Sequence, residues 1–266
     1  MDFTVKKYKE LLESFIHHDY KLMGFKVFLD SKPTGKFIIL RHDVDEQPLN
    51  ALKMATAEKE MGILSTYYFR KVSKSDNPEV IRKIASMGHE IGYHYEDLSS
   101  SEGDIDRAIV SFKSNLDYFR QYYPVETVCM HGSSSSKFDN RDIWNHCHLS
   151  DFGLIGEPYL SCDFKKIFYM TDTGYAWDGG KYAVRDKVQS TFDVSFHSTD
   201  QVIDAINKGI FPEQAMILAH TLWTDSFSKW ITLHLRESIR NRIKLLTKKS
   251  HLISKLYSKA VKLYWK

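Results

Sequence analysis

The stretch FIILRHDVD, residues 37–45, begins as an apolar strand and ends in two carboxylates. Side chains two apart on a strand point to the same face, so Asp43 and Asp45 are predicted to project into one small volume, where their charges favour a bound cation. A second short strand, in GHEIGYH at residues 88–94, ends in His94. Because a parallel α/β fold gathers its strand ends at one edge, we expect His94 to join the two carboxylates in a metal site.

Strand and helix patterns alternate along the rest of the chain. Short apolar runs bounded by turn residues predict strands at residues 37–45, 63–69, 89–94, 125–130, 168–172, 192–197 and 215–220. Apolar residues at helical spacing predict helices between them, at residues 49–61, 78–87, 105–123, 139–148 and 202–208. This alternation predicts an α/β fold in which about seven parallel strands are wound as a barrel.

Length and composition place the chain among globular proteins. Its 266 residues suffice for one large domain or two small ones, and 42% apolar residues with 14% aromatics provide a substantial core. The three cysteines form no CxxC pair and are odd in number, which favours a reducing compartment over a disulfide framework. The first residues contain no secretion signal, and no stretch has the length of a membrane span. We therefore expect a soluble, cytoplasmic protein.

The charge is distributed unevenly. Residues 228–266 contain eleven Lys or Arg and only Glu237 as an acid, a net charge of +10. Because the whole chain has a net charge of +3, residues 1–227 have a net charge of −7. We therefore predict two units, a folded domain at 1–227 and a basic amphipathic helical tail at 228–266. The tail resembles an interfacial helix for an anionic bilayer, so peripheral contact at the inner membrane face is one expectation. A helix that docks on its own domain is the alternative, and nucleic acid is not expected because no recognition motif is present.

Four predicted strands end in a side chain that can bind a metal or move a proton, namely Asp45, His94, His131 and His220. A divalent ion held by one carboxylate and two imidazoles can activate a water molecule, a free carboxylate can take the proton of that water, and a histidine can protonate a leaving nitrogen. Asp43 is the predicted base, Asp45 a ligand and His220 the acid. Taken singly, each residue also fits an ordinary role as a helix cap or a polar rim residue.

These residues resemble the motifs of the NodB-type polysaccharide deacetylases, carbohydrate esterase family 4, over residues 36–224. The first motif of the family is matched by RHDVDEQP at 41–48, the second by GHEIGYH at 88–94 and the last by MILAH at 216–220. Asp172 with Trp177 resembles the acid and tryptophan motif that supports the catalytic histidine. The resemblance implies an irregular (β/α) barrel, with one acid of the first motif as base and the other as a metal ligand.

The chain also departs from the family pattern. The family's second metal histidine would stand at Leu98, so a ligand is missing from its usual place. His131 is the preferred replacement and Glu96 the alternative, and a set of imidazoles and carboxylate suits zinc best. The acids are spaced as Asp-Val-Asp, which leaves open a second assignment with Asp45 as the base and Glu46 on the metal. Two candidates remain for the arginine that steadies the base, Arg41 and Arg185.

The resemblance implies a zinc-dependent hydrolase that removes an N-acetyl group from an amino sugar or glycan intermediate. The pattern is most similar to intracellular members of the superfamily that are associated with surface-polysaccharide biosynthesis. One alternative is an amide or C–N hydrolase with a small non-sugar substrate. The other is a pseudo-deacetylase without catalysis that serves as a glycan-binding or membrane-bound scaffold, which Leu98 favours and the presence of Asp43, Asp45 and His220 together opposes.

Overall fold

The computed structural model describes residues 1–132, 136–178, 185, 187–247 and 257. Within these residues seven strands form one sheet in which every pairing is parallel. They run in the order β5-β4-β3-β2-β7-β6, and β1 also pairs with β2. Their bounds are β1 Lys21–Met23, β2 Phe37–Val44, β3 Thr66–Phe69, β4 Glu90–Tyr95, β5 Val128–Met130, β6 Phe168–Thr171 and β7 Gln214–Leu218.

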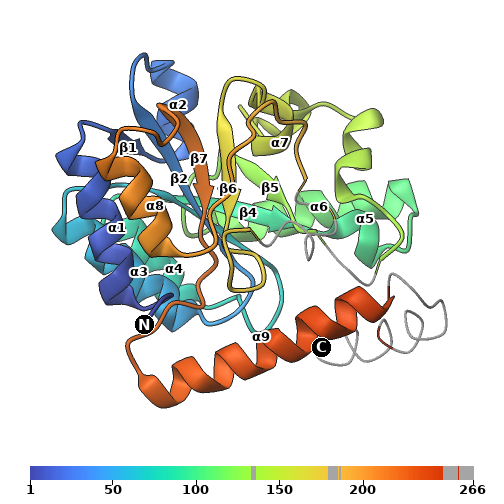
Figure 1. Cartoon of the computed structure of the whole chain (residues 1–266). Coiled ribbons are helices and arrows are strands. Elements are labelled where there is room, and N and C mark those ends of the chain that lie inside the picture. The colour runs from blue at the N-terminus through green and yellow to red at the C-terminus, as the bar shows by residue number, and fades with distance from the viewer. Residues whose placement is uncertain (133–135, 179–184, 186, 248–256, 258–266) are drawn as a thin grey trace.

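Helices cover the faces of this sheet (Figure 1). They are α1 Val5–His17, α2 Phe25–Ser31, α3 Pro48–Glu60, α4 Pro78–Ser86, α5 Asp97–Ser100, α6 Ile105–Arg120, α7 Pro158–Ser161, α8 Thr199–Asn207 and α9 Phe227–Thr247, with short 3-10 helices η1 Asn140–Asn145 and η2 Leu149–Phe152. Local sequence sets several of the helix starts. Pro48 and Pro78 are the first residues of α3 and α4. The side chains of Asn77 and Asp104 cap α4 and α6 by accepting hydrogen bonds from backbone N–H groups in the first turn of each helix.

Strand β2 is the centre of the sheet. All eight of its residues are buried, as expected for a parallel strand with helices on both faces. One edge pairs with β7, while the other is shared by β1 over its first half and β3 over its second. The carboxyl end of β2, which carries the two predicted acids, therefore lies between the ends of β3 and β7.

The α/β class and a sheet of about seven parallel strands are confirmed, although one predicted strand is wrong. Residues 192–197 form no strand, because Phe192 and Phe196 pack their rings against Phe168 without pairing their backbone. The seventh strand is β1, whose three residues are too short to give a pattern and which is held by its pairing with β2. Within the described residues no pairing joins β5 to β6, so the barrel is irregular and open there.

Helix α9 crosses beneath the sheet at the bottom of Figure 1. It contains residues 228–247 of the predicted basic tail, and residues 248–256 and 258–266 lie outside the described part of the chain. Among the described residues, no helix is long and apolar enough to span a bilayer.

Candidate metal and acid–base site

Asp43 and Asp45 come together at the end of β2, as their spacing predicts. His94 Nε2 lies 3.5 Å from Asp43 Oδ2 and 3.6 Å from Asp45 Oδ1. His94 reaches this position from β4, two strands away, because β3 pairs with both β2 and β4. The two carboxylates and this imidazole therefore share one small volume.

Gly92 brings β4 close to its neighbour on the way to His94. A Cβ atom at this position would lie 2.3 Å from ring carbons of Tyr68 and 2.9 Å from the carbonyl oxygen of Thr127. Only a residue without a side chain fits against the buried Tyr68 ring there. The last glycine of the GHEIG motif thus has a packing role that supports the placement of His94.

The His94 ring is held in the orientation of a metal ligand. Its Nδ1 lies 2.9 Å from the carbonyl oxygen of Cys129, which can only accept, so Nδ1 carries the proton and Nε2 keeps its lone pair. Burial lowers the pKa of His94, which favours this neutral form even though Asp43 and Asp45 oppose the shift. A backbone carbonyl behind one ring nitrogen is the usual support of a ligating histidine.

His131 is held in a similar way from the next strand end. Its Nδ1 lies 3.0 Å from Glu96 Oε2, and its Nε2 lies 3.5 Å from Asp45 Oδ1. Glu96 is gripped in turn by Arg70, whose Nη2 donates to both carboxylate oxygens at 2.7 and 2.8 Å. Burial alone would raise the pKa of Glu96, but Arg70 and His131 outweigh it and lower that pKa to about 2. Glu96 therefore stays ionised and supports His131 from behind.

Leu98 does not face this site. Its side chain is 2% exposed and packs in a core cluster with residues of α6. The position where the family pattern has its second histidine is thus part of the hydrophobic core. His131 lies beside Asp45 instead, which is the replacement that the sequence favours over Glu96.

The donor set fits a divalent metal ion. Asp43 Oδ1 and Asp45 Oδ1 are buried and accept no hydrogen bond within the described residues, which is costly unless a cation satisfies them. Burial would raise the pKa of Asp45, but nearby positive charge outweighs burial and lowers it, and the Arg70 guanidinium lies 3.7 Å from Asp45 Oδ1. One or two carboxylates with two neutral imidazoles are the ligands that zinc prefers.

Cys129 is a nearby donor that sequence reasoning missed. Its sulfur, an Asp43 oxygen and a His94 ring nitrogen all lie within 4.8 Å of one another, and all three residues are buried. A signal was present, because Cys129 stands two residues before His131 in the chain, within the predicted strand that leads into that histidine. In the structure Cys129 of β5 pairs with His94 of β4. A thiolate here would also suit zinc.

His220 and Asp172 form a second unit just beyond the carboxyl ends of β7 and β6. Asp172 Oδ1 lies 2.7 Å from His220 Nδ1 and accepts from the His220 backbone N–H at 2.9 Å, so the His220 Nε2 is left free to act. Trp223 Nε1 donates to the other Asp172 oxygen at 2.7 Å. Burial alone would lower the pKa of His220, but Asp172, Asp45 and Asp43 outweigh it and raise that pKa to about 10. His220 is therefore protonated at neutral pH, as a general acid must be.

The sheet register brings this histidine toward the two acids. Arg41 of β2 pairs with Leu218 of β7, so Asp43 and His220 follow two residues later on neighbouring strands. The Ala219 N–H, which donates to the Arg41 carbonyl at 3.1 Å, continues the pairing beyond β7.

Arg41 is the arginine that contacts the predicted base. Its guanidinium is fully buried, and Nη2 donates to Asp43 Oδ2 and to the Tyr159 hydroxyl, each at 3.0 Å. The other candidate, Arg185, donates to the Ser136 carbonyl at 2.7 Å. Arg41 stands two residues before Asp43 on the same strand, so strand periodicity offered the signal.

Two further sequence assignments differ from the observed contacts. Glu46, the alternative metal ligand, accepts hydrogen bonds from Arg236 and Arg240 of α9. Trp177, which the motif pairs with Asp172, donates from Nε1 to Thr199 Oγ1 at 2.9 Å. Trp223 contacts Asp172 in its place, because the turn after β7 brings it there.

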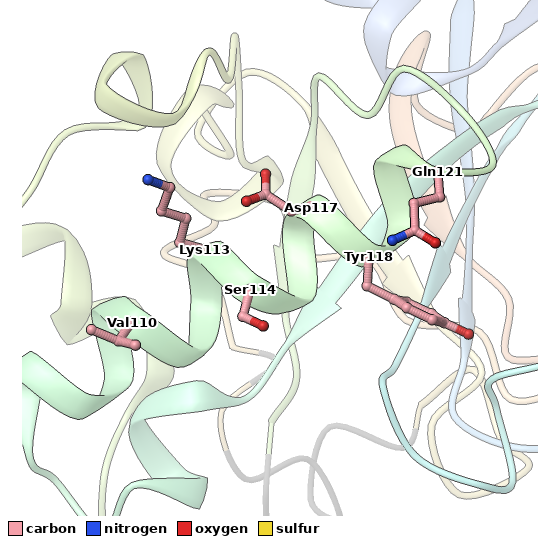
Figure 2. A pocket seen from close by; sticks show the side chains of 6 residues that line it. All are labelled: Val110, Lys113, Ser114, Asp117, Tyr118 and Gln121. Carbon is pink, nitrogen blue, oxygen red and sulfur yellow. The ribbon is translucent and has the colours of Figure 1, made fainter.

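A shallow pocket lies on the outer face of α6, away from these residues. Figure 2 shows its lining, which consists of Val110, Lys113, Ser114, Asp117, Tyr118 and Gln121. None of the site residues described above contributes to it. The candidate site at the strand ends is therefore separate from this pocket.

Comparison with known proteins gives matches only among solved structures. No family model matches the sequence, and no curated protein matches it. The chain is similar in structure to carbohydrate esterases of family 4. PdaA of Bacillus subtilis, a family 4 carbohydrate esterase, is 14% identical, with 86% of this chain and 83% of that chain covered and a TM-score of 0.42.

Two further matches are of the same kind. A CE4 esterase of Streptococcus mutans is 13% identical, with 82% of this chain and 85% of that chain covered and a TM-score of 0.43. Wild-type BA3943 of Bacillus anthracis, described as a CE4 family pseudoenzyme, is 13% identical, with 77% of this chain and 61% of that chain covered and a TM-score of 0.41.

Replacing Glu96 by Gln should weaken zinc binding about 10- to 100-fold, because Glu96 holds the His131 ring without being placed as a ligand. Competition with a chelating dye measures the affinity. Glu126→Gln is the matched control, since Glu126 pairs with Lys26 at 2.5 Å and has no contact with the site. An unchanged affinity in Glu96→Gln would show that His131 does not bind the ion.

Proposed function

We propose that the protein is a metal-dependent deacetylase that removes an N-acetyl group from an amino sugar or glycan intermediate. One observation carries the proposal. The Nε2 atoms of His94 and His131 both face Asp45 while their Nδ1 atoms are held by hydrogen bonds, and the hydrogen-bonded pair His220–Asp172 lies just beyond the ends of β7 and β6. The proposal extends to a cytoplasmic role in surface-polysaccharide biosynthesis and to the division into residues 1–227 and 228–266.

The residues divide the work of amide hydrolysis between them. Asp45, His94 and His131 would hold a zinc ion, which when bound polarises the acetyl carbonyl and lowers the pKa of water. Asp43 accepts the proton of the attacking water, and Arg41 fixes its carboxylate through Oδ2 while leaving Oδ1 available.

The leaving nitrogen needs a proton of its own. An amine anion is a very poor leaving group, so C–N cleavage requires a general acid. His220 supplies that proton from Nε2, because Nδ1 is engaged by Asp172. Asp172 is thus a positioning residue that also keeps His220 charged.

The test is acetate release from N-acetylated amino sugars and oligosaccharides by zinc-loaded protein. We expect release that a chelator abolishes and added zinc restores. Asp43→Asn should lose activity by about 10²- to 10⁴-fold, the contribution of a general base, while it still binds zinc. Chelator-resistant release would point to another hydrolase, and sugar binding without any release would point to a non-catalytic glycan-binding protein.

A further inference from the structure

Helix α9 docks on the domain through one face. Leu233, Glu237 and Asn241, which follow one another at four-residue spacing, are 3%, 6% and 7% exposed. Asn241 Nδ2 donates to the Gly174 carbonyl at 2.8 Å, and Trp230 Nε1 donates to the Asp2 carbonyl at 2.8 Å. The orientation of α9 about its own axis is therefore fixed.

A charged cluster anchors the same face beside the candidate site. Arg236 Nη1 donates to Glu46 Oε2 at 3.0 Å, and Arg240 Nη1 lies 3.3 Å from the other oxygen of this buried carboxylate. Glu46 directly follows Asp45, and Gly174 lies two residues after Asp172. Helix α9 is thus fastened to the two loops that carry site residues.

The opposite face of α9 carries an apolar stripe. Helical residues two apart lie about 200° apart around the axis, so Ile231, Leu235 and Ile239 point away from the docked face. Leu235 and Ile239 are 62% and 59% exposed, and no described residue covers them. We call the exposed apolar residues of this face the outer stripe, and they are Phe227, Ile231, Leu235, Ile239, Leu245 and Leu246.

The basic residues of this segment limit which partners can cover the outer stripe. Residues 228–247 carry five Lys or Arg against Glu237, a net charge of +4, and the sequence of residues 248–266 adds six Lys and no acid, so two copies of the chain meeting stripe to stripe would bring two basic segments together. Nucleic acid would match the charge but would offer nothing to the apolar side chains. An anionic bilayer satisfies both features, because it accepts apolar side chains at its interface and gains about 1 kcal/mol per basic residue near the surface.

We propose that the outer stripe of α9 docks this protein onto the surface of an anionic lipid bilayer. The proposal goes beyond the deacetylase function and does not depend on it. Helix α9 is bound to the loops that follow Asp45 and Asp172. The side of the molecule that would face the bilayer is therefore next to the edge of the sheet that carries the candidate site. The bilayer is bound at its interface, and α9 keeps its contacts with the domain.

The test is co-sedimentation of the full chain with vesicles of phosphatidylcholine alone or mixed with phosphatidylglycerol. We expect at least about tenfold stronger partition onto the anionic vesicles, decreasing as salt screens the basic residues. The double variant Leu235→Glu/Ile239→Glu should lower this partition about tenfold or more, because it places two carboxylates at the interface. Both side chains are exposed, so the melting temperature should not change.

Val110→Glu is the matched control, since Val110 is 71% exposed on the outer face of α6, where Figure 2 shows it. Its partition should equal that of the unmodified chain. Equal partition of the double variant and the unmodified chain would overturn the proposal. A dimer of the unmodified chain that is absent from the double variant, as measured by light scattering, would also overturn the proposal, because a second copy would then cover the stripe.

Discussion

His94→Gln and Asp45→Asn should each reduce bound zinc from about one ion per chain to almost none and lower acetate release by about a thousandfold or more. His94 Nε2 and Asp45 Oδ1 lie 3.6 Å apart, so each is predicted to be a ligand of the same ion. Losing the ion removes several kcal/mol of transition-state stabilisation. Elemental analysis of the purified variants measures the zinc content.

A control separates this effect from general damage to the fold. His197 is exposed and pairs with Asp178 at 3.0 Å, so His197→Gln should retain both zinc and activity. Zinc should raise the melting temperature of the unmodified protein and of this control but not of His94→Gln, because only a bound ligand stabilises the folded state. Normal zinc content in both His94→Gln and Asp45→Asn would remove the proposed site.

Asp172→Asn should shift the pH dependence of activity and reduce its maximum about 10²- to 10⁴-fold. Asp172 contributes most to raising the pKa of His220, which is about 10, and it accepts the Nδ1 hydrogen bond that leaves Nε2 free. The acid works only while protonated, so activity in the unmodified protein should persist at neutral pH and fall as the pH rises through about 10. In Asp172→Asn the fall should come at lower pH, because the neutral amide no longer stabilises the charged ring.

The measurement is kcat/KM for acetate release against pH, with zinc content determined at each point. Asp178→Asn is the matched control, because half-buried Asp178 also pairs with a histidine, the exposed His197. Its pH profile should match that of the unmodified protein. An alkaline limit that stays in place in Asp172→Asn would show that His220 is not the acid.

The predicted fold came from local patterns that the structure preserves. The apolar run before Asp43 is β2, and the run before His94 is β4, because buried parallel strands need continuous apolar residues. The strand predicted at residues 192–197 is wrong, since Phe196 is buried by ring packing, which the same apolar pattern also satisfies. The three-residue β1 was not predictable, because it exists only through pairing with β2.

The candidate site was predictable where one strand decides the geometry. Asp43 and Asp45 share a face because strand side chains alternate, and His220 follows β7 at the same edge. The supporting contacts were not predictable, because each depends on distances between segments far apart in the chain. Trp223 rather than Trp177 reaches Asp172 for this reason.

The sequence by itself determined which donors stand at the strand ends, because a period of two and a parallel alternation fix the face and the edge on which they lie. Only the tertiary structure decided that Glu96 stands behind His131, that Arg41 holds Asp43, and that α9 is docked with its outer stripe exposed. These outcomes depend on which of several charged partners comes within hydrogen-bond distance. Packing between segments far apart in the chain sets that distance, and local sequence patterns do not predict it.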